Sequence, residues 1–150
     1  MVIIADTTAL IALENTGYFD LLRTVFGHLL ITPIVADEWG MNVPDWIYIE
    51  PVKDHERFVQ LKVVVDPGEA SSLALALETP GSTVLTDDRK ARLLADHLMV
   101  MTTGTLAVIL LAKERGHIPS VRPVITALKG SGFRMSVALE KQVLLMADEI

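Results

Sequence analysis

Residues 2–13, VIIADTTALIAL, decide the fold that we predict for this chain. Val2 to Ala5 form a short apolar run, which is typical of a buried parallel strand. The residues that follow carry apolar side chains at helical spacing: Ala9, Leu10 and Leu13. Asp6 therefore stands at the carboxyl end of a strand, which in an open α/β sheet is the edge where ligands bind. The alternative is that Asp6 only caps the following helix.

Length and composition predict one domain that needs no disulfides or structural metals for stability. A chain of 150 residues can bury a substantial core, so we expect a single domain over residues 1–150. Hydrophobic residues make up 51% of the chain, but no apolar run is long enough to cross a bilayer. The N-terminus also lacks a basic start followed by a signal-type segment. We therefore expect a cytoplasmic protein with no membrane contact.

Cysteine content and charge limit the kinds of site that the chain can hold. It has no cysteine, which excludes disulfides, zinc–thiolate sites and thiol nucleophiles, so a metal would be held mainly by oxygen or imidazole. The formal net charge of −6 argues against a protein that wraps nucleic acid electrostatically. It permits acids that gather around cations in a small site. The histidines are scattered without ligand spacing and are assigned to packing or the surface: His28, His55, His97 and His117.

Strands and helices are predicted to alternate along the whole chain. After the first strand we predict strands at residues 29–31, 46–49, 83–86 and 99–101. Helices follow at residues 18–26, 33–39, 54–61 and 67–79, and then from Arg89, from Thr103-Gly104-Thr105, from Ser120 as N-cap and from Ser136 as N-cap. Such alternation is the signature of a parallel sheet covered on both faces. We predict an α/β fold, a three-layer α/β/α sandwich.

Several acids take comparable places in this plan: Asp6, Glu38, Glu69, Asp87 and Asp88. Asp6 and the Asp87–Asp88 pair follow strands, whereas Glu38 and Glu69 lie on helices. Carboxylates that converge on one edge repel one another, so such a group persists mainly when divalent cations offset the charge. Oxygen ligands select Mg²⁺ or Mn²⁺. The matching chemistry is phosphodiester hydrolysis, in which the metal activates water and orients the phosphate.

Segments spread over nearly the whole chain resemble one protein family. In order they are IADTTALIAL, TPIVADE, PGEASSLALALE, LTDDRKAR and TTGTLAVILLAKERGHIPSVRP. Their arrangement is similar to that of the PIN-domain ribonucleases, in particular the short prokaryotic toxin-like branch. The resemblance implies a five-stranded parallel sheet and an acidic metal site that cuts single-stranded RNA. It also implies a homodimer and an antitoxin protein as partner.

The resemblance assigns roles to individual residues. The positions that match the family's catalytic and metal-binding acids are Asp6, Glu38, Glu69 and Asp88, with Thr8, Thr86 and Asp87 as supporting residues beside them. Side chains alternate along a strand, so Asp87 and Asp88 should point to opposite sides, and we expect only Asp88 to bind metal directly. One departure is Trp39, which stands where an aliphatic residue commonly follows the acid that Glu38 matches.

Charged residues outside this set are assigned more simply. Arg89, Lys90 and Arg92 follow the acid pair, and contact with RNA phosphates and a plain solvated face are equally consistent with such a run. The remaining acids of note are assigned to solvated surfaces: Asp20, Asp37, Glu114, Asp148 and Glu149.

Two other functions compete with a nuclease. An aspartyl-phosphate phosphotransfer domain also has a strand that ends in an acid and a later acid pair, but it needs a lysine at a strand end, and no predicted strand ends in lysine. A non-catalytic PIN-fold module that binds protein or RNA is the other alternative. A divalent cation should add little to the melting temperature of such a module.

Overall fold

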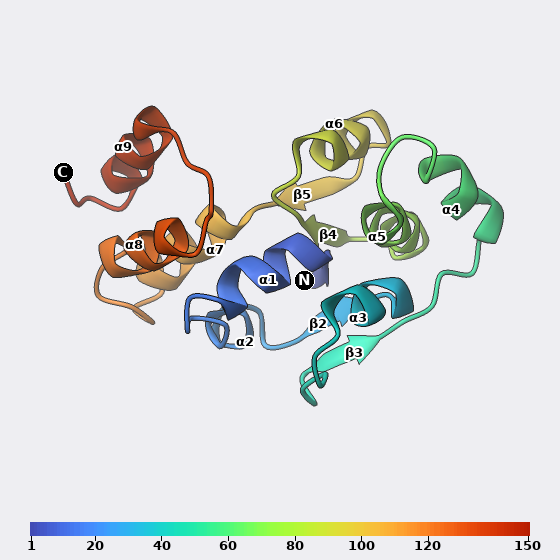
Figure 1. Cartoon of the computed structure of the whole chain (residues 1–150), viewed down its shortest axis with the longest axis horizontal. Helices are drawn as coiled ribbons and strands as arrows, with labels where there is room; N and C mark the ends of the chain where they lie inside the picture. Colours follow the sequence, from blue (N-terminus) through green and yellow to red (C-terminus); the bar gives the residue numbers. More distant parts are fainter.

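A computed structural model describes the whole chain, residues 1–150, as alternating strands and helices (Figure 1). The strands are β1 Val2–Ala5, β2 Leu29–Ile31, β3 Ile47–Ile49, β4 Ser82–Leu85 and β5 Met101–Thr103. The helices are α1 Thr7–Glu14, α2 Leu21–Phe26, α3 Pro33–Trp39, α4 His55–Leu61, α5 Pro67–Glu78, α6 Arg89–His97, α7 Thr105–Glu114, α8 Arg122–Gly130 and α9 Val137–Met146. None of these helices combines the length and apolar composition needed to cross a membrane.

The five strands form one parallel sheet in the order β3-β2-β1-β4-β5. Its central strand, β1, pairs with β4 from Val2–Ser82 to Ala5–Leu85. The predicted α/β fold with a five-stranded parallel sheet is therefore confirmed. Because all strands run in one direction, the residues that follow them meet at one edge of the sheet: Asp6, Thr32, Glu50, Thr86 and Gly104.

Apolar clusters cover the two faces of the sheet. Neighbouring residues of β1 point to opposite faces, so that Ile3 belongs to the first cluster and Ile4 to the second. The first cluster includes residues of α1, α2, α3 and α7, and the second includes residues of α4, α5 and α6. Helices on both faces give the predicted three-layer α/β/α arrangement.

The predicted start of the last strand is wrong by two residues. β5 begins at Met101 and not at Met99. Met99 has a positive φ of 59° and is 91% exposed. Its amide donates to the carbonyl of Asp96, so Met99 completes the turn that ends α6 and does not join the sheet.

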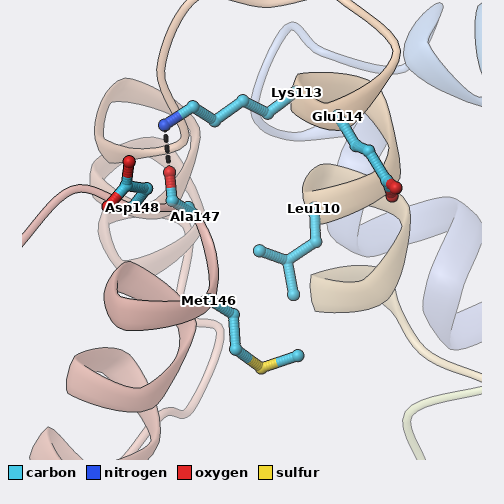
Figure 2. A pocket seen from close by; sticks show the side chains of 6 residues that line it. All are labelled: Leu110, Lys113, Glu114, Met146, Ala147 and Asp148. Carbon is cyan, nitrogen blue, oxygen red and sulfur yellow. Dashed lines mark hydrogen bonds between the residues drawn. The ribbon is translucent and has the colours of Figure 1, made fainter.

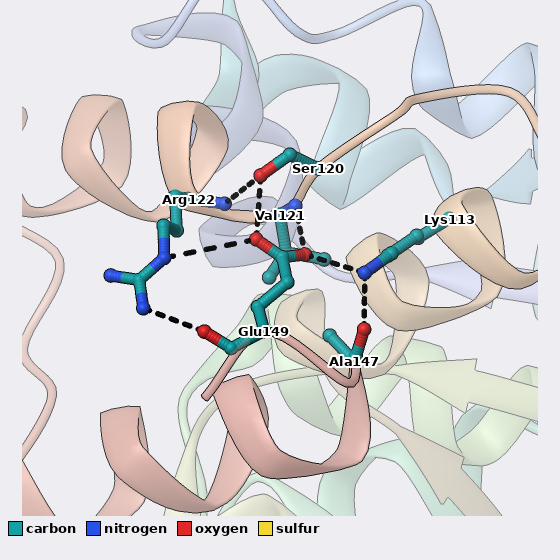
Figure 3. Close-up of polar contacts among 6 residues, drawn as sticks. All are labelled: Lys113, Ser120, Val121, Arg122, Ala147 and Glu149. Atoms are coloured by element: carbon teal, nitrogen blue, oxygen red, sulfur yellow. Dashed lines mark hydrogen bonds and ion pairs between the residues drawn. The ribbon is translucent and has the colours of Figure 1, made fainter.

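Glu149 joins the C-terminal residues to the start of α8 (Figure 3). Its carboxylate accepts hydrogen bonds from the Ser120 hydroxyl, from the Val121 amide at 2.8 Å and from Lys113 Nζ at 2.9 Å. Burial raises the pKa of Glu149, but these hydrogen bonds and the Lys113 charge outweigh it and hold the pKa at about 2. The predicted N-cap is wrong by one residue, because Val121 and not Ser120 directly precedes α8; the Ser120 hydroxyl donates to Glu149 and accepts from the Arg122 amide at 3.3 Å. The assignment of Glu149 to a solvated surface is also wrong, since only 11% of its side chain is exposed.

A third apolar cluster lies among α7, α8 and α9, to one side of the sheet (Figure 1). A cavity of about 410 Å³ opens between α7 and α9, with Leu110 and Met146 on its walls (Figure 2). Lys113 reaches across from α7 to donate a hydrogen bond to the carbonyl of Ala147. None of the acids predicted to form the site lines this cavity.

Replacing Glu149 by Gln should lower the stability of the protein at neutral pH, because Gln carries no charge to pair with Lys113. The pKa of Glu149 is held below its usual value of 4.5, so its stabilising effect is fully present above that pH and is lost as the pH falls toward about 2. The difference in free energy of unfolding between the parent and Glu149→Gln, measured by urea titration from neutral to acid pH, should shrink accordingly. Asp148→Asn is the matched control, since Asp148 is exposed and forms no ion pair. Equal losses in both variants would contradict the prediction.

Candidate active site

Asp6 lies directly after β1 and is only 1% exposed. Its Oδ1 accepts hydrogen bonds from the Thr8 hydroxyl at 2.7 Å and the Ala9 amide at 3.2 Å, and its Oδ2 accepts one from the Thr86 hydroxyl. Burial raises the pKa of Asp6, and the charge of Asp87 adds to this, although the three hydrogen bonds act in the opposite direction. Asp6 caps α1, which is the alternative role considered for it from the sequence. It is also a buried acid without an ion pair.

Thr86 connects Asp6 with Asp88. Its amide donates to the carbonyl of Thr103 at 2.9 Å, which extends the pairing of β4 by one residue, and its side chain is fully buried. The Thr86 hydroxyl donates to Asp6 and accepts from the Asp88 amide at 3.2 Å. Asp88 Oδ2 in turn accepts from the Ala91 amide at 2.8 Å and caps α6. One hydroxyl group therefore helps to fix acids that belong to two different strand ends.

Asp87 has different partners from its neighbour Asp88. Its Oδ1 accepts from the Thr105 amide at 2.8 Å and its Oδ2 from the Thr105 hydroxyl, so that it anchors the start of α7. The backbone comes so close at Gly104 that a Cβ there would lie 2.9 Å from Asp87 Oδ1. Both oxygens of Asp87 thus have donors on α7, whereas only one oxygen of Asp88 has a donor. The two acids therefore differ in the number of carboxylate oxygens that are already hydrogen-bonded.

Glu69 lies in the first turn of α5 and is 7% exposed. Asp66 caps the same helix by accepting the Glu69 amide at 2.9 Å. Burial raises the pKa of Glu69 to about 8, and the charges of Asp66, Asp88 and Asp6 contribute to the increase. Asp66, Asp88 and Asp6 therefore lie within electrostatic reach of Glu69, and none of these acids forms an ion pair with lysine or arginine.

Glu38 is exposed, yet its carboxylate is held close to the start of α5. The Thr7 hydroxyl donates to Glu38 Oε1 at 2.6 Å. A Cβ built on Gly68 would lie only 2.1 Å from the same oxygen, so a residue with a side chain at this position would displace the carboxylate. Because Gly68 precedes Glu69, Glu38 reaches the same part of the sheet edge as the other acids.

Trp39, the residue that departs from the family pattern, packs in the core. It is 8% exposed and stacks on Phe19, with ring centroids 5.4 Å apart. Its indole N–H donates to Glu14 at 3.1 Å. Trp39 therefore fills the buried role of an aliphatic residue, and its neighbour Glu38 still lies at the sheet edge.

The three basic residues predicted to bind RNA differ in their contacts. Arg92 Nη1 donates to the carbonyl of Thr86 at 3.4 Å and lies close to Gly104. Arg89 and Lys90 are exposed and form no ion pair. Arg92 is thus next to the acids, and the other two project from the first turn of α6.

A family model described as a PIN domain matches residues 2–149. The chain belongs to the PIN-domain family. PIN domains are generally nucleases and typically use divalent metals, and membership of the family supports RNA as the substrate. No curated protein and no solved structure matches the chain.

The chemistry of the donor set in this PIN domain suits a hard divalent cation. As the side chains stand, no group of three or more acids or histidines is arranged to hold a metal ion. However, the candidate ligands are all carboxylates, and burial together with the charges of Asp66, Asp88 and Asp6 raises the pKa of Glu69. Gly68 also leaves room for the carboxylate of Glu38. Oxygen donors of this kind fit Mg²⁺ or Mn²⁺ and not zinc.

Some residues of this PIN domain site were missed by sequence reasoning: Thr7, Asp66, Gly68 and Thr105. Asp66 could have been found, because an Asp directly before a proline is a typical start of a helix. Thr7 and Thr105 act on acids that are 31 and 18 positions away, and no local pattern marks them. The absence of a side chain at Gly68 is important only because Glu38, on α3, approaches it closely.

Replacing Asp6 by Asn should leave the PIN domain as stable as the parent, or more stable, in the presence of EDTA. Asn also caps helices, and it removes a buried charge that the other acids repel. Asp6→Ala should lower the free energy of unfolding by about 1 kcal/mol, since the Ala9 amide loses its acceptor. Urea unfolding of the three proteins at pH 7 measures this difference. Equal destabilisation by Asn and Ala would show that the fold requires the charge itself.

Proposed function

We propose that this PIN domain is a divalent-metal-dependent endoribonuclease that hydrolyses phosphodiester bonds of single-stranded RNA. The observation that carries the proposal is that acids from four segments lie along one sheet edge, with no basic residue paired to any of them: Asp6, Glu38, Glu69 and Asp88. An arrangement of this kind is costly for the fold, because like charges in a partly buried site repel. A site that binds a divalent cation together with a phosphate requires such a concentration of negative charge.

The same four acids would hold Mg²⁺ or Mn²⁺. A bound divalent ion supplies an activated water nucleophile at neutral pH and offsets the charge that develops on the phosphate. The protein's own groups hold the acids in place. The hydroxyls of Thr8 and Thr86 fix the Asp6 carboxylate, and the bond from the Ala91 amide fixes that of Asp88. Asp87 supports the site through its two bonds to Thr105.

The missing lysine argues against phosphotransfer through an aspartyl phosphate. The strands end at Ala5, Ile31, Ile49, Leu85 and Thr103, and none is followed directly by a lysine. A phosphoaspartyl site would need such a residue to bind the phosphate. The arrangement of charges therefore favours metal-assisted hydrolysis.

The direct test is cleavage of a labelled single-stranded oligoribonucleotide in Mn²⁺, in Mg²⁺ and in EDTA. Cleavage should require the divalent ion and should disappear in EDTA, because no other group in the site can activate water. Asp88→Asn should abolish cleavage while keeping the cap of α6, since Asn is also a good cap. Asp87→Asn should lose only about 10- to 100-fold, as expected for a residue that supports a ligand.

Each result of this test bears on the proposal. Cleavage that persists in excess EDTA would overturn the metal mechanism. A larger loss in Asp87→Asn than in Asp88→Asn would show that the roles of the two acids are reversed. If the parent does not cut RNA and Mn²⁺ raises its melting temperature by no more than that of Asp6→Asn, the chain is a non-catalytic binding module.

The basic residues after the acid pair should contribute to RNA binding. Replacing Arg89, Lys90 and Arg92 together by Gln should weaken binding, and each lost phosphate contact should reduce the slope of log affinity against log salt by about 0.7. Fluorescence anisotropy with a single-stranded RNA in EDTA measures both quantities. A triple variant of the exposed residues Arg23, Lys53 and Lys141 removes the same charge elsewhere on the surface. Equal slopes in the two triple variants would mean that the first set is a plain solvated face.

The resemblance to the toxin-like branch adds finer roles to this proposal. They are the toxin function, an antitoxin protein as partner, and a homodimer. Exposed apolar side chains on the C-terminal helix, Val137, Leu145 and Met146, supply a surface that a protein partner can cover.

A further inference from the structure

A cleft of about 310 Å³ lies between α1 and the segment that connects α8 to α9. It opens beside the acids, because Thr8 and Asp87 line it and Thr8 also donates a hydrogen bond to Asp6. No acid that we assign to cation binding lines the cleft itself. The cleft is therefore a separate space that adjoins the site of hydrolysis.

The outer wall of the cleft is a short loop fixed to α1. The Ser131 hydroxyl donates to the carbonyl of Asn15, the residue that ends α1, at 3.0 Å. Gly132 follows with a φ of +92°, a conformation that residues with a side chain rarely adopt. The chain then turns so that Phe133 and Arg134 line the cleft opposite α1. Phe133 is half-buried and packs against the third apolar cluster, which holds this wall in place.

The side chains along the cleft combine three kinds of chemistry. Ile11, which is 40% exposed, and Phe133 provide apolar surface. Asn15 provides an amide with two donors and one acceptor, and its side chain has no hydrogen-bond partner in the protein. Arg134 is an exposed guanidinium that pairs with no acid. An apolar wall, an amide and a guanidinium together match the base, the base edge and the phosphate of a nucleotide.

We propose that this cleft binds one unpaired nucleotide of single-stranded RNA next to the phosphate that is cut. The base lies against Phe133 and Ile11, Asn15 binds the edge of the base, and Arg134 binds a neighbouring phosphate. A volume of about 310 Å³ is at the small end of the range for ligand pockets, about 300–1,000 Å³, and suits one nucleotide rather than a duplex. This inference rests on the proposed nuclease function. It adds to that function the residues that would select the substrate: Ile11, Asn15, Phe133 and Arg134.

The test measures binding without metal and cleavage with it. In EDTA, each of the four nucleoside 5′-monophosphates is titrated into ¹⁵N-labelled protein, and a labelled single-stranded oligoribonucleotide is titrated into the parent and variants. Amide shifts should map to Asn15 and to residues 131–134. Arg134→Gln should weaken oligonucleotide binding about tenfold, as expected for the loss of a charged hydrogen bond, and Asn15→Ala should change the preference among the four nucleotides. Arg23→Gln, the same charge change on α2, should leave binding unchanged.

Cleavage with Mn²⁺ separates this inference from the proposed function. Arg134→Gln and Asn15→Ala should raise KM about tenfold and leave kcat close to that of the parent, because neither residue touches the acids. If the parent cuts RNA and both variants keep its KM and its affinity, the cleft is not a nucleotide site and only this inference fails. If nucleotides shift residues 131–134 and the parent does not cut RNA, the cleft is a nucleotide site and the nuclease proposal fails.

Discussion

The parallel pairing of β1 with β4 is the contact on which the site depends. The two strands pair along their whole length, and the Asp6 amide extends the pairing with a bond to the carbonyl of Leu85 at 3.0 Å. This register sets Asp6 beside Thr86, although the residues are 80 positions apart. The Thr86 hydroxyl then links Asp6 to Asp88. A shift of one residue in the pairing would move these side chains to the wrong faces of the sheet.

In this protein, the acids that cap helices also contribute to the negative charge at the sheet edge. Asp6, Asp66 and Asp88 each cap a helix that begins at the carboxyl edge of the sheet. A cap fixes the direction of a carboxylate, and the positive end of a helix dipole lessens the cost of its charge. The dipoles do not cancel the repulsion, because burial and the neighbouring acids still raise the pKa of Glu69 to about 8. A cation that binds there would relieve a cost that the fold already carries.

The C-terminal helices extend the site beyond the acids. Glu149 ties the end of the chain to Lys113 and Ser120, which fixes α9 relative to α7 and α8. The loop between α8 and α9 is tied separately to α1 by Ser131. The second attachment holds the loop that lines the cleft next to α1, so the residues proposed to cut RNA and those proposed to select it come from distant parts of the chain.

Local sequence determined the order of the elements, because apolar periodicity, prolines and capping residues act over a few positions. It also placed Asp6, Glu38, Glu69 and the acid pair at element ends, and the PIN-like pattern singled out the same positions. The tertiary structure decided what no local pattern encodes. The engagement of Glu149, the bonds of Asp87 to α7, and the approach of Gly68 to Glu38 each join segments far apart in the chain. Such contacts depend on how whole elements pack against one another, which no short stretch of sequence specifies.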